Sequence, residues 1–195
     1  MKSVLEKAAE NQKKAWQIIK ETDIINIWES MGAKVNLIGS LKTGLLMKNR
    51  DIDFHIYTDN LTPMESFSAM SKLAENPSIK RIQYGNLIDT DEKCIEWHAW
   101  YEDGEGEEWQ IDMIHIMKGS LYDGYFEKVA ERILSLLTPE LKERILTIKN
   151  DTPEAEKIPG IMYYMAVIRD DVQNYDEFYE WRKKYSDIRI IEWMS

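Results

Sequence analysis

A glycine-serine turn followed by two closely spaced aspartates occupies residues 38–53, which read IGSLKTGLLMKNRDID. The turn is Gly39-Ser40, and it ends a short apolar segment that predicts a buried strand. Asp51 and Asp53 begin a segment in which polar and apolar residues alternate, which predicts a second strand with one polar face. Both aspartates share that face, with Cβ atoms about 6 to 7 Å apart. Two carboxylates at this spacing can hold divalent metal ions.

The rest of the chain predicts a sheet-rich core followed by helices. Apolar residues at helical spacing predict one long helix over residues 4–28, or two helices joined near Thr22-Asp23. The other core elements expected are a helix from Thr62 to about Ala74 and strands at 34–38, 51–57, 79–87, 94–101 and 108–116. We therefore expect an α+β fold, with a mixed β-sheet core flanked by helices and a helical C-terminal part. The expected boundaries are 1–118 for the core, with its N-terminal helix and an inserted hairpin, and 119–195 for the helical region.

A third aspartate, Asp112, lies between Ile111 and Met113 in an otherwise apolar strand, where an unpaired charge would be costly to bury. Three strand aspartates behind a Gly-Ser turn suit a two-metal phosphoryl-transfer site. Mg²⁺ is the natural ion there, because it takes oxygen ligands from a few carboxylates and from substrate phosphates. The backbone N–H groups of Gly39 and Ser40 would then bind the terminal phosphates. Taken singly, Asp51 and Asp53 are also explained by a solvated strand edge, and Asp112 by a salt bridge to an arginine.

Together these elements resemble the nucleotidyltransferase superfamily, whose pattern is an apolar strand, Gly-Ser, a spacer, Asp-x-Asp and a later strand with a third Asp. The resemblance covers roughly residues 32–116 and is nearest to the small-molecule, antibiotic-type members. It implies a polymerase-beta-like core that transfers a nucleoside monophosphate from an NTP, expected to be ATP, to a hydroxyl of a small-molecule acceptor and releases pyrophosphate. By this resemblance Gly39 and Ser40 bind the nucleotide, and two Mg²⁺ ions are held by the catalytic residues Asp51, Asp53 and Asp112.

Charged residues near the turn suggest further contacts with substrates. Lys42 is the loop lysine nearest to Ser40, and we expect it to bind the nucleotide by neutralising triphosphate charge. The acidic residues after the strand at 94–101 either form a solvated turn or attract a cationic acceptor such as an aminosugar. They are Asp103, Glu105, Glu107 and Glu108. A P-loop kinase is excluded, because Gly44 is followed by Leu45 where that motif needs lysine.

Composition restricts the partners and the setting. The chain has 35 acidic and 25 basic residues, a formal net charge of −10 and no basic run, so no nucleic-acid polymer is expected as a partner. The one cysteine, Cys94, excludes an internal disulfide and a cysteine-rich metal site. The sequence contains no signal-peptide pattern and no apolar run long enough to span a membrane, so we expect a cytoplasmic protein that makes no membrane contact. The oligomeric state is not defined by the sequence.

Two other functions fit the same residues. One is a non-catalytic nucleotide-binding or protein-interaction module that has kept the fold. The other is a nucleotidyltransferase whose acceptor is a side chain of a protein partner. All three carboxylates are present, which favours catalysis over the non-catalytic module.

Overall fold

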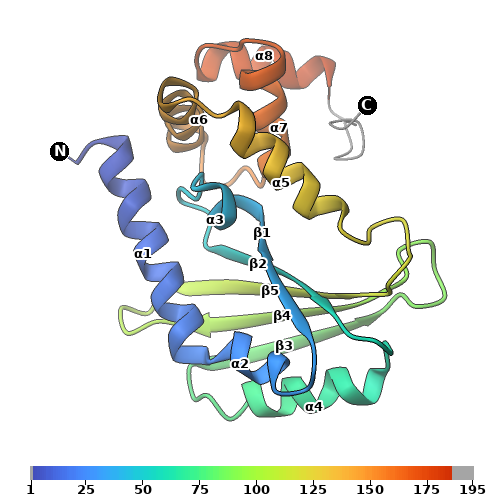
Figure 1. The fold of residues 1–195 in the computed structure, drawn as a ribbon. Helices are drawn as coiled ribbons and strands as arrows, with labels where there is room; N and C mark the ends of the chain where they lie inside the picture. The colour runs from blue at the N-terminus through green and yellow to red at the C-terminus, as the bar shows by residue number, and fades with distance from the viewer. Residues whose placement is uncertain (1, 186–195) are drawn as a thin grey trace.

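A five-stranded mixed sheet forms the centre of the protein in a computed structural model, which describes residues 2–185 (Figure 1). The strands are β1 Lys34–Ile38, β2 Asp51–Tyr57, β3 Ile79–Asn86, β4 Cys94–Glu102 and β5 Glu108–Ile116. Their order in the sheet is β1-β2-β5-β4-β3, in which β2 and β5 run parallel and every other neighbouring pair is antiparallel. The sheet order places β5 between β2 and β4, and this arrangement decides which side chains meet at the centre.

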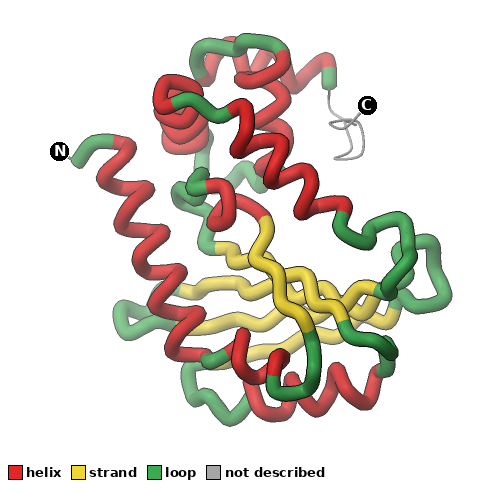
Figure 2. The backbone as a smooth tube through the Cα atoms, viewed as in Figure 1, coloured by secondary structure: helices red, strands yellow, loops and turns green. Residues whose placement is uncertain are grey.

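Helices precede, interrupt and follow the sheet (Figure 2). In the first half of the chain they are α1 Val4–Thr22, α2 Ile24–Glu29, α3 Gly39–Thr43 and α4 Pro63–Leu73. After the sheet come α5 Tyr125–Leu136, α6 Pro139–Asp151, α7 Gly160–Tyr164, a π-helical turn η1 Met165–Arg169 and α8 Tyr175–Lys184. The expected α+β fold, with a mixed sheet and a helical C-terminal part, is therefore confirmed.

Local signals account for the helix boundaries. Ser3 and Glu6 form a capping box at the start of α1, and Thr62 accepts a hydrogen bond from the Glu65 backbone at the start of α4. Asp23 adopts a left-handed conformation with φ of 52°, which ends α1 and starts α2. Of the two arrangements that the sequence allowed for residues 4–28, the structure has the pair of helices.

The two faces of the sheet differ in chemistry. Alternate residues of the central strands, such as Ile52 and Phe54 in β2 and Ile111 in β5, are buried in one apolar cluster with residues of α1, α2 and α4. We call this cluster the sheet core. The residues between them, including Asp51 and Asp53, point to the opposite face because side chains alternate along a strand. That face is turned toward the helices that follow the sheet (Figure 1).

A second apolar cluster, the helical cluster, joins buried residues of α5 to α8, including Leu146 and Phe178, with Leu45 and Met47 of the loop after α3. Its helices belong to the region expected at 119–195, of which residues 186–195 lie outside the described part of the chain. Helix α1 belongs to both clusters, because Ala8 packs in the helical cluster and Ile18 in the sheet core. Within residues 2–185, no helix is both long and apolar enough to cross a bilayer.

Candidate active site

Strand register brings the three predicted carboxylates together. In the parallel pairing of β2 with β5, Asp53 lies opposite Asp112 and Asp51 lies opposite Gln110. All these residues lie on the face of the sheet opposite the sheet core. The predicted pair and the third aspartate therefore meet on two neighbouring strands.

The turn that precedes α3 lies directly beside these carboxylates. Gly39 follows Ile38, which pairs with Asp53 in the antiparallel register of β1 with β2. Gly39 has a φ of +68°, and a Cβ added there would lie 2.8 Å from the Asp53 carboxyl carbon and closer still to Oδ2. Only glycine fits this position, because it tolerates a left-handed conformation and has no side chain to strike the carboxylate. The sequence predicted phosphate binding by the Gly39 backbone, and the structure adds the Asp53 side chain as a close neighbour.

The carboxylates are crowded and poorly solvated. Loss of solvation raises the pKa of Asp53 well above its ordinary value, and the nearby charges of Asp51 and Asp112 raise it further. Loss of solvation also raises the pKa of Asp51, and the charge of Lys149 partly offsets this rise. The buried Oδ1 atom of Asp51 has no hydrogen-bond partner within the described residues. An unpartnered oxygen among mutually repelling carboxylates is what a divalent cation would satisfy, so these three residues fit a Mg²⁺ site.

A buried lysine forms the cationic part of the site. Lys149 of α6 donates from Nζ to the Leu45 carbonyl at 2.9 Å, to Ser40 Oγ at 3.1 Å and to the Tyr164 hydroxyl at 3.3 Å. Ser40 Oγ and the Tyr164 hydroxyl are themselves 3.0 Å apart. The turn that was predicted to bind phosphate is thus held by a positive charge from a helix more than a hundred residues later in the chain.

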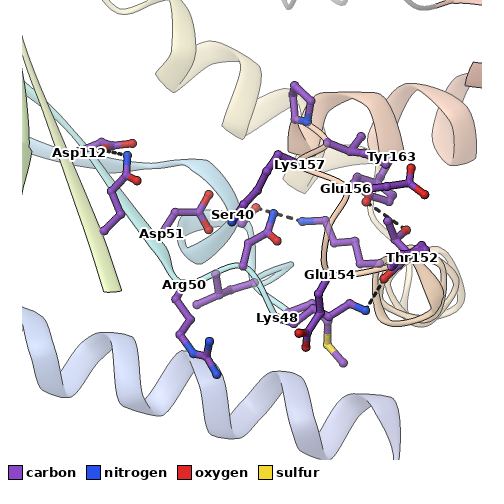
Figure 3. A pocket seen from close by; sticks show the side chains of 18 of the residues that line it. Ser40, Lys48, Arg50, Asp51, Asp112, Thr152, Glu154, Glu156, Lys157 and Tyr163 are labelled. Carbon is purple, nitrogen blue, oxygen red and sulfur yellow. Dashed lines mark hydrogen bonds between the residues drawn. The ribbon is translucent and has the colours of Figure 1, made fainter. Parts of the chain in front are cut away.

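Ser40, Asp51, Asp112 and Lys149 line a cleft of about 650 Å³ between the sheet and the segment that joins α6 to α7, whereas the predicted site residues Gly39 and Asp53 are not among its lining residues. Figure 3 shows Ser40, Asp51 and Asp112 on one side of this cleft, with Thr152 to Lys157 on the other. Lys48 bonds the Thr152 carbonyl across the cleft, and Arg50 forms an ion pair with Glu107. The exposed Lys157 also lines the cleft and lowers the pKa of Asp51 by its charge.

Not every residue that the sequence suggested lies in this cleft. Lys42 is exposed on α3 and is not among the cleft-lining residues, although its neighbour Ser40 is. Asp103, Glu105 and Glu107 gather their carboxylates at the β4–β5 turn, where they form ion pairs with Lys14, and Glu107 also pairs with Arg50. These cations neutralise part of the charge that was considered as an attraction for a cationic acceptor.

Lys149 and His98 were not predicted to belong to the site, and Tyr164 was left between two interpretations. The stretch that contains Tyr164 fits either a packed helix face or the lining of an acceptor pocket. The signal for Lys149 is its position on the apolar side of α6, four residues after Ile145 and one turn after Leu146, both fully buried. A lysine on a buried helix face needs a polar partner. His98 has no Cys or His at a zinc-ligand spacing and was given no site role, yet its Nδ1 lies 2.7 Å from Asp112 Oδ1.

Comparison with known proteins supports the fold. No protein-family model and no curated protein matches the sequence. Among solved structures, one of Cid1, described by its RNA terminal uridylyl transferase activity, superposes with a TM-score of 0.57 at 16% identity over 80% of this chain and 48% of that one. The GLD-2/RNP-8 complex gives a TM-score of 0.57 at 10% identity, covering 85% of this chain and 60% of that one. The non-canonical poly(A) polymerase complex GLD-2–GLD-3 gives 0.53 at 12% identity, covering 96% and 64%.

The chain therefore shares the fold of these terminal uridylyl transferase and poly(A) polymerase structures, which agrees with the fold that the resemblance implied. At identities of 10 to 16%, these likenesses show the fold alone. The chain also spans only about half to two thirds of the length of the proteins it matches.

Proposed function

We propose that this protein is a metal-dependent nucleotidyltransferase, which transfers a nucleoside monophosphate from an NTP to an acceptor hydroxyl and releases pyrophosphate. The observation that carries the proposal is the meeting of Asp51, Asp53 and Asp112 on adjacent strands, beside the Gly39-Ser40 turn and the buried Lys149 that holds it. The superfamily fold adds support, since the solved neighbours are nucleotidyltransferases.

Each side chain has a role in this proposal. Asp51, Asp53 and Asp112 would hold Mg²⁺, which when bound neutralises phosphate charge and makes the acceptor oxygen a better nucleophile. Ser40 binds the terminal phosphates, Lys149 holds Ser40 and adds positive charge beside it, and Lys157 adds positive charge at the opposite wall. The rate gain comes from alignment of the acceptor with the α-phosphorus and from charge stabilisation, without a covalent enzyme intermediate.

We further propose a small molecule as the acceptor and ATP as the donor. The net charge of −10 disfavours a phosphate polymer, and Glu108, Glu154 and Glu156 line the open part of the cleft. These carboxylates favour an acceptor with amino groups. The solved neighbours include proteins described as an RNA terminal uridylyl transferase and a poly(A) polymerase. The test must therefore distinguish a small-molecule acceptor from the 3′ hydroxyl of an RNA.

Calorimetric titration of each NTP, with and without Mg²⁺, tests the site. We expect Mg²⁺-dependent binding that is lost in Asp53→Asn and kept in Asp59→Asn, because Asp59 is an exposed carboxylate beyond the other end of β2. Release of pyrophosphate is then measured with a panel of aminosugars, an RNA oligonucleotide and protein acceptors. Binding without release under any acceptor would favour the non-catalytic module, and equal binding by wild type and Asp53→Asn would refute the assignment of the site.

A further inference from the structure

Within residues 2–185, Asp112 is the carboxylate of the three that side-chain nitrogen atoms hold from two strands. His98 lies directly opposite Asp112 in the antiparallel register of β4 with β5. Its Nδ1 atom is 2.7 Å from Asp112 Oδ1. Gln110, two residues earlier on the same face of β5, donates from Nε2 to the same oxygen at 2.8 Å.

The chemistry of the contact assigns the donor. An ionised carboxylate only accepts hydrogen bonds, so His98 Nδ1 carries the proton and donates it to Asp112. Two N–H groups then occupy Oδ1, while Oδ2 has no hydrogen bond from any residue between 2 and 185. The His98 and Asp112 side chains are 24% and 22% exposed, so the pair is screened from bulk water yet open to the cleft side of the sheet.

Because the two hydrogen bonds hold only one oxygen of Asp112, they affect how the carboxylate would bind a cation. A carboxylate that is free to rotate presents either oxygen or both, and loses that freedom when it binds a metal ion. Here the rotation is already restrained before binding, because two donors on two strands hold one oxygen. Hydrogen-bond partners of this kind orient metal ligands. Removing one typically weakens metal binding by about 10- to 100-fold.

We propose that His98 is a positioning residue for Asp112: together with Gln110 it holds Oδ1 and leaves Oδ2 as the oxygen that ligates the metal ion. The inference rests on the proposed function, since it assumes that Asp112 is a metal ligand. His98 acts through Asp112 and is not assigned a contact with the nucleotide or the acceptor.

The test is Mn²⁺ affinity, measured by water-proton relaxation on the full chain with and without a non-hydrolysable NTP analogue. His98→Ala should weaken Mn²⁺ binding by about 10- to 100-fold. His98→Asn should restore most of this affinity, because its amide N–H lies near the position of Nδ1, whereas the amide of His98→Gln reaches nearer to the position of Nε2 and should not. Glu96→Ala is the matched control, since Glu96 lies two residues earlier on the same face of β4 and makes no contact with Asp112 that the structure records.

Thermal unfolding of every variant separates positioning from folding. Weak Mn²⁺ binding by Ala and Gln, recovery with Asn, and similar unfolding temperatures would support the inference. Wild-type affinity in His98→Ala, or no recovery in a well-folded His98→Asn, would overturn it and leave the proposed function intact. If the wild-type protein binds no Mn²⁺ even with the nucleotide analogue, both the inference and the proposed function fail.

Discussion

Replacing Gly39 by alanine should damage both the stability of the protein and the proposed metal site. Two costs add at this position. A left-handed conformation costs a residue with a side chain about 1 to 2 kcal/mol, and Gly39 has a φ of +68°. The new Cβ would also lie 2.8 Å from the Asp53 carboxyl carbon, well inside normal contact, and overpacking of this kind costs about 1 to 3 kcal/mol.

The total expected loss in the free energy of unfolding is about 2 to 5 kcal/mol, which lowers Tm by roughly 4 to 20 °C in a chain of this size. To relieve the clash the Asp53 carboxylate must move, and a misplacement of about 1 Å near the chemistry costs about 100-fold in rate. Gly32→Ala is the matched control, because Gly32 has a φ of +79° but nothing within 4 Å of the added Cβ. It should lose only the backbone cost, about 1 to 2 kcal/mol, and keep full activity.

Urea denaturation and Mg²⁺-dependent NTP binding measure the two effects. The stability cost of Gly39→Ala should fall toward that of Gly32→Ala when it is placed in an Asp53→Ala background, where the carboxylate is gone. Equal stability losses for the two glycine variants, together with unchanged NTP binding by Gly39→Ala, would refute the claim that Asp53 is what requires glycine at this turn.

Three further predictions concern charge. Asp53→Asn should raise the Tm of the metal-free protein in a calorimetric scan, because it removes a poorly solvated charge that Asp51 and Asp112 repel; an unchanged or lower Tm would contradict this account. Loss of solvation lowers the pKa of His115 to about 4, so as pH falls the unfolded chain takes up a proton before the folded protein does. The free energy of unfolding should therefore fall by about 3 kcal/mol as pH drops from about 6.5 to about 4. Urea titrations should show this fall in wild type and a smaller one in His115→Gln. Lys149→Met should weaken NTP binding by about 10- to 100-fold, which is the value of a charge-assisted hydrogen bond. Lys42 is exposed, so Lys42→Met should bind NTP nearly as well as wild type. The reverse ranking in calorimetry would favour Lys42, and not Lys149, as the residue that contacts the nucleotide.

Most of the fold could be predicted because its signals are local. Alternation marks the strands, and capping residues such as Thr62 mark helix starts, so element boundaries differ from the expected ones by about one or two residues. The three aspartates could also be grouped in advance, since they share strand faces and a known pattern. The pattern does not predict contacts between residues that are far apart in the sequence. Lys149 bonds Ser40 across 109 residues, and no short-range signal pairs them.

The contact between His98 and Asp112 falls between these cases. The β4–β5 hairpin is centred near Glu105, and a symmetric turn there pairs residues whose numbers add to 210, which places His98 opposite Asp112. The register could therefore have been counted from the turn, whereas the rotamers that complete the hydrogen bond depend on packing in three dimensions.

Helix α1 has a further consequence for how substrates enter. Its 19 residues extend over roughly 28 Å, with Ala8 anchored among the helices beyond the cleft and Ile18 anchored under the sheet. A rigid rod fastened at both ends opposes any hinge-like rotation of one half of the molecule against the other. Under the proposed function, nucleotide binding should then involve only local movement of the segment from Thr152 to Pro159. The sheet and the helices around the cleft would keep their relative positions.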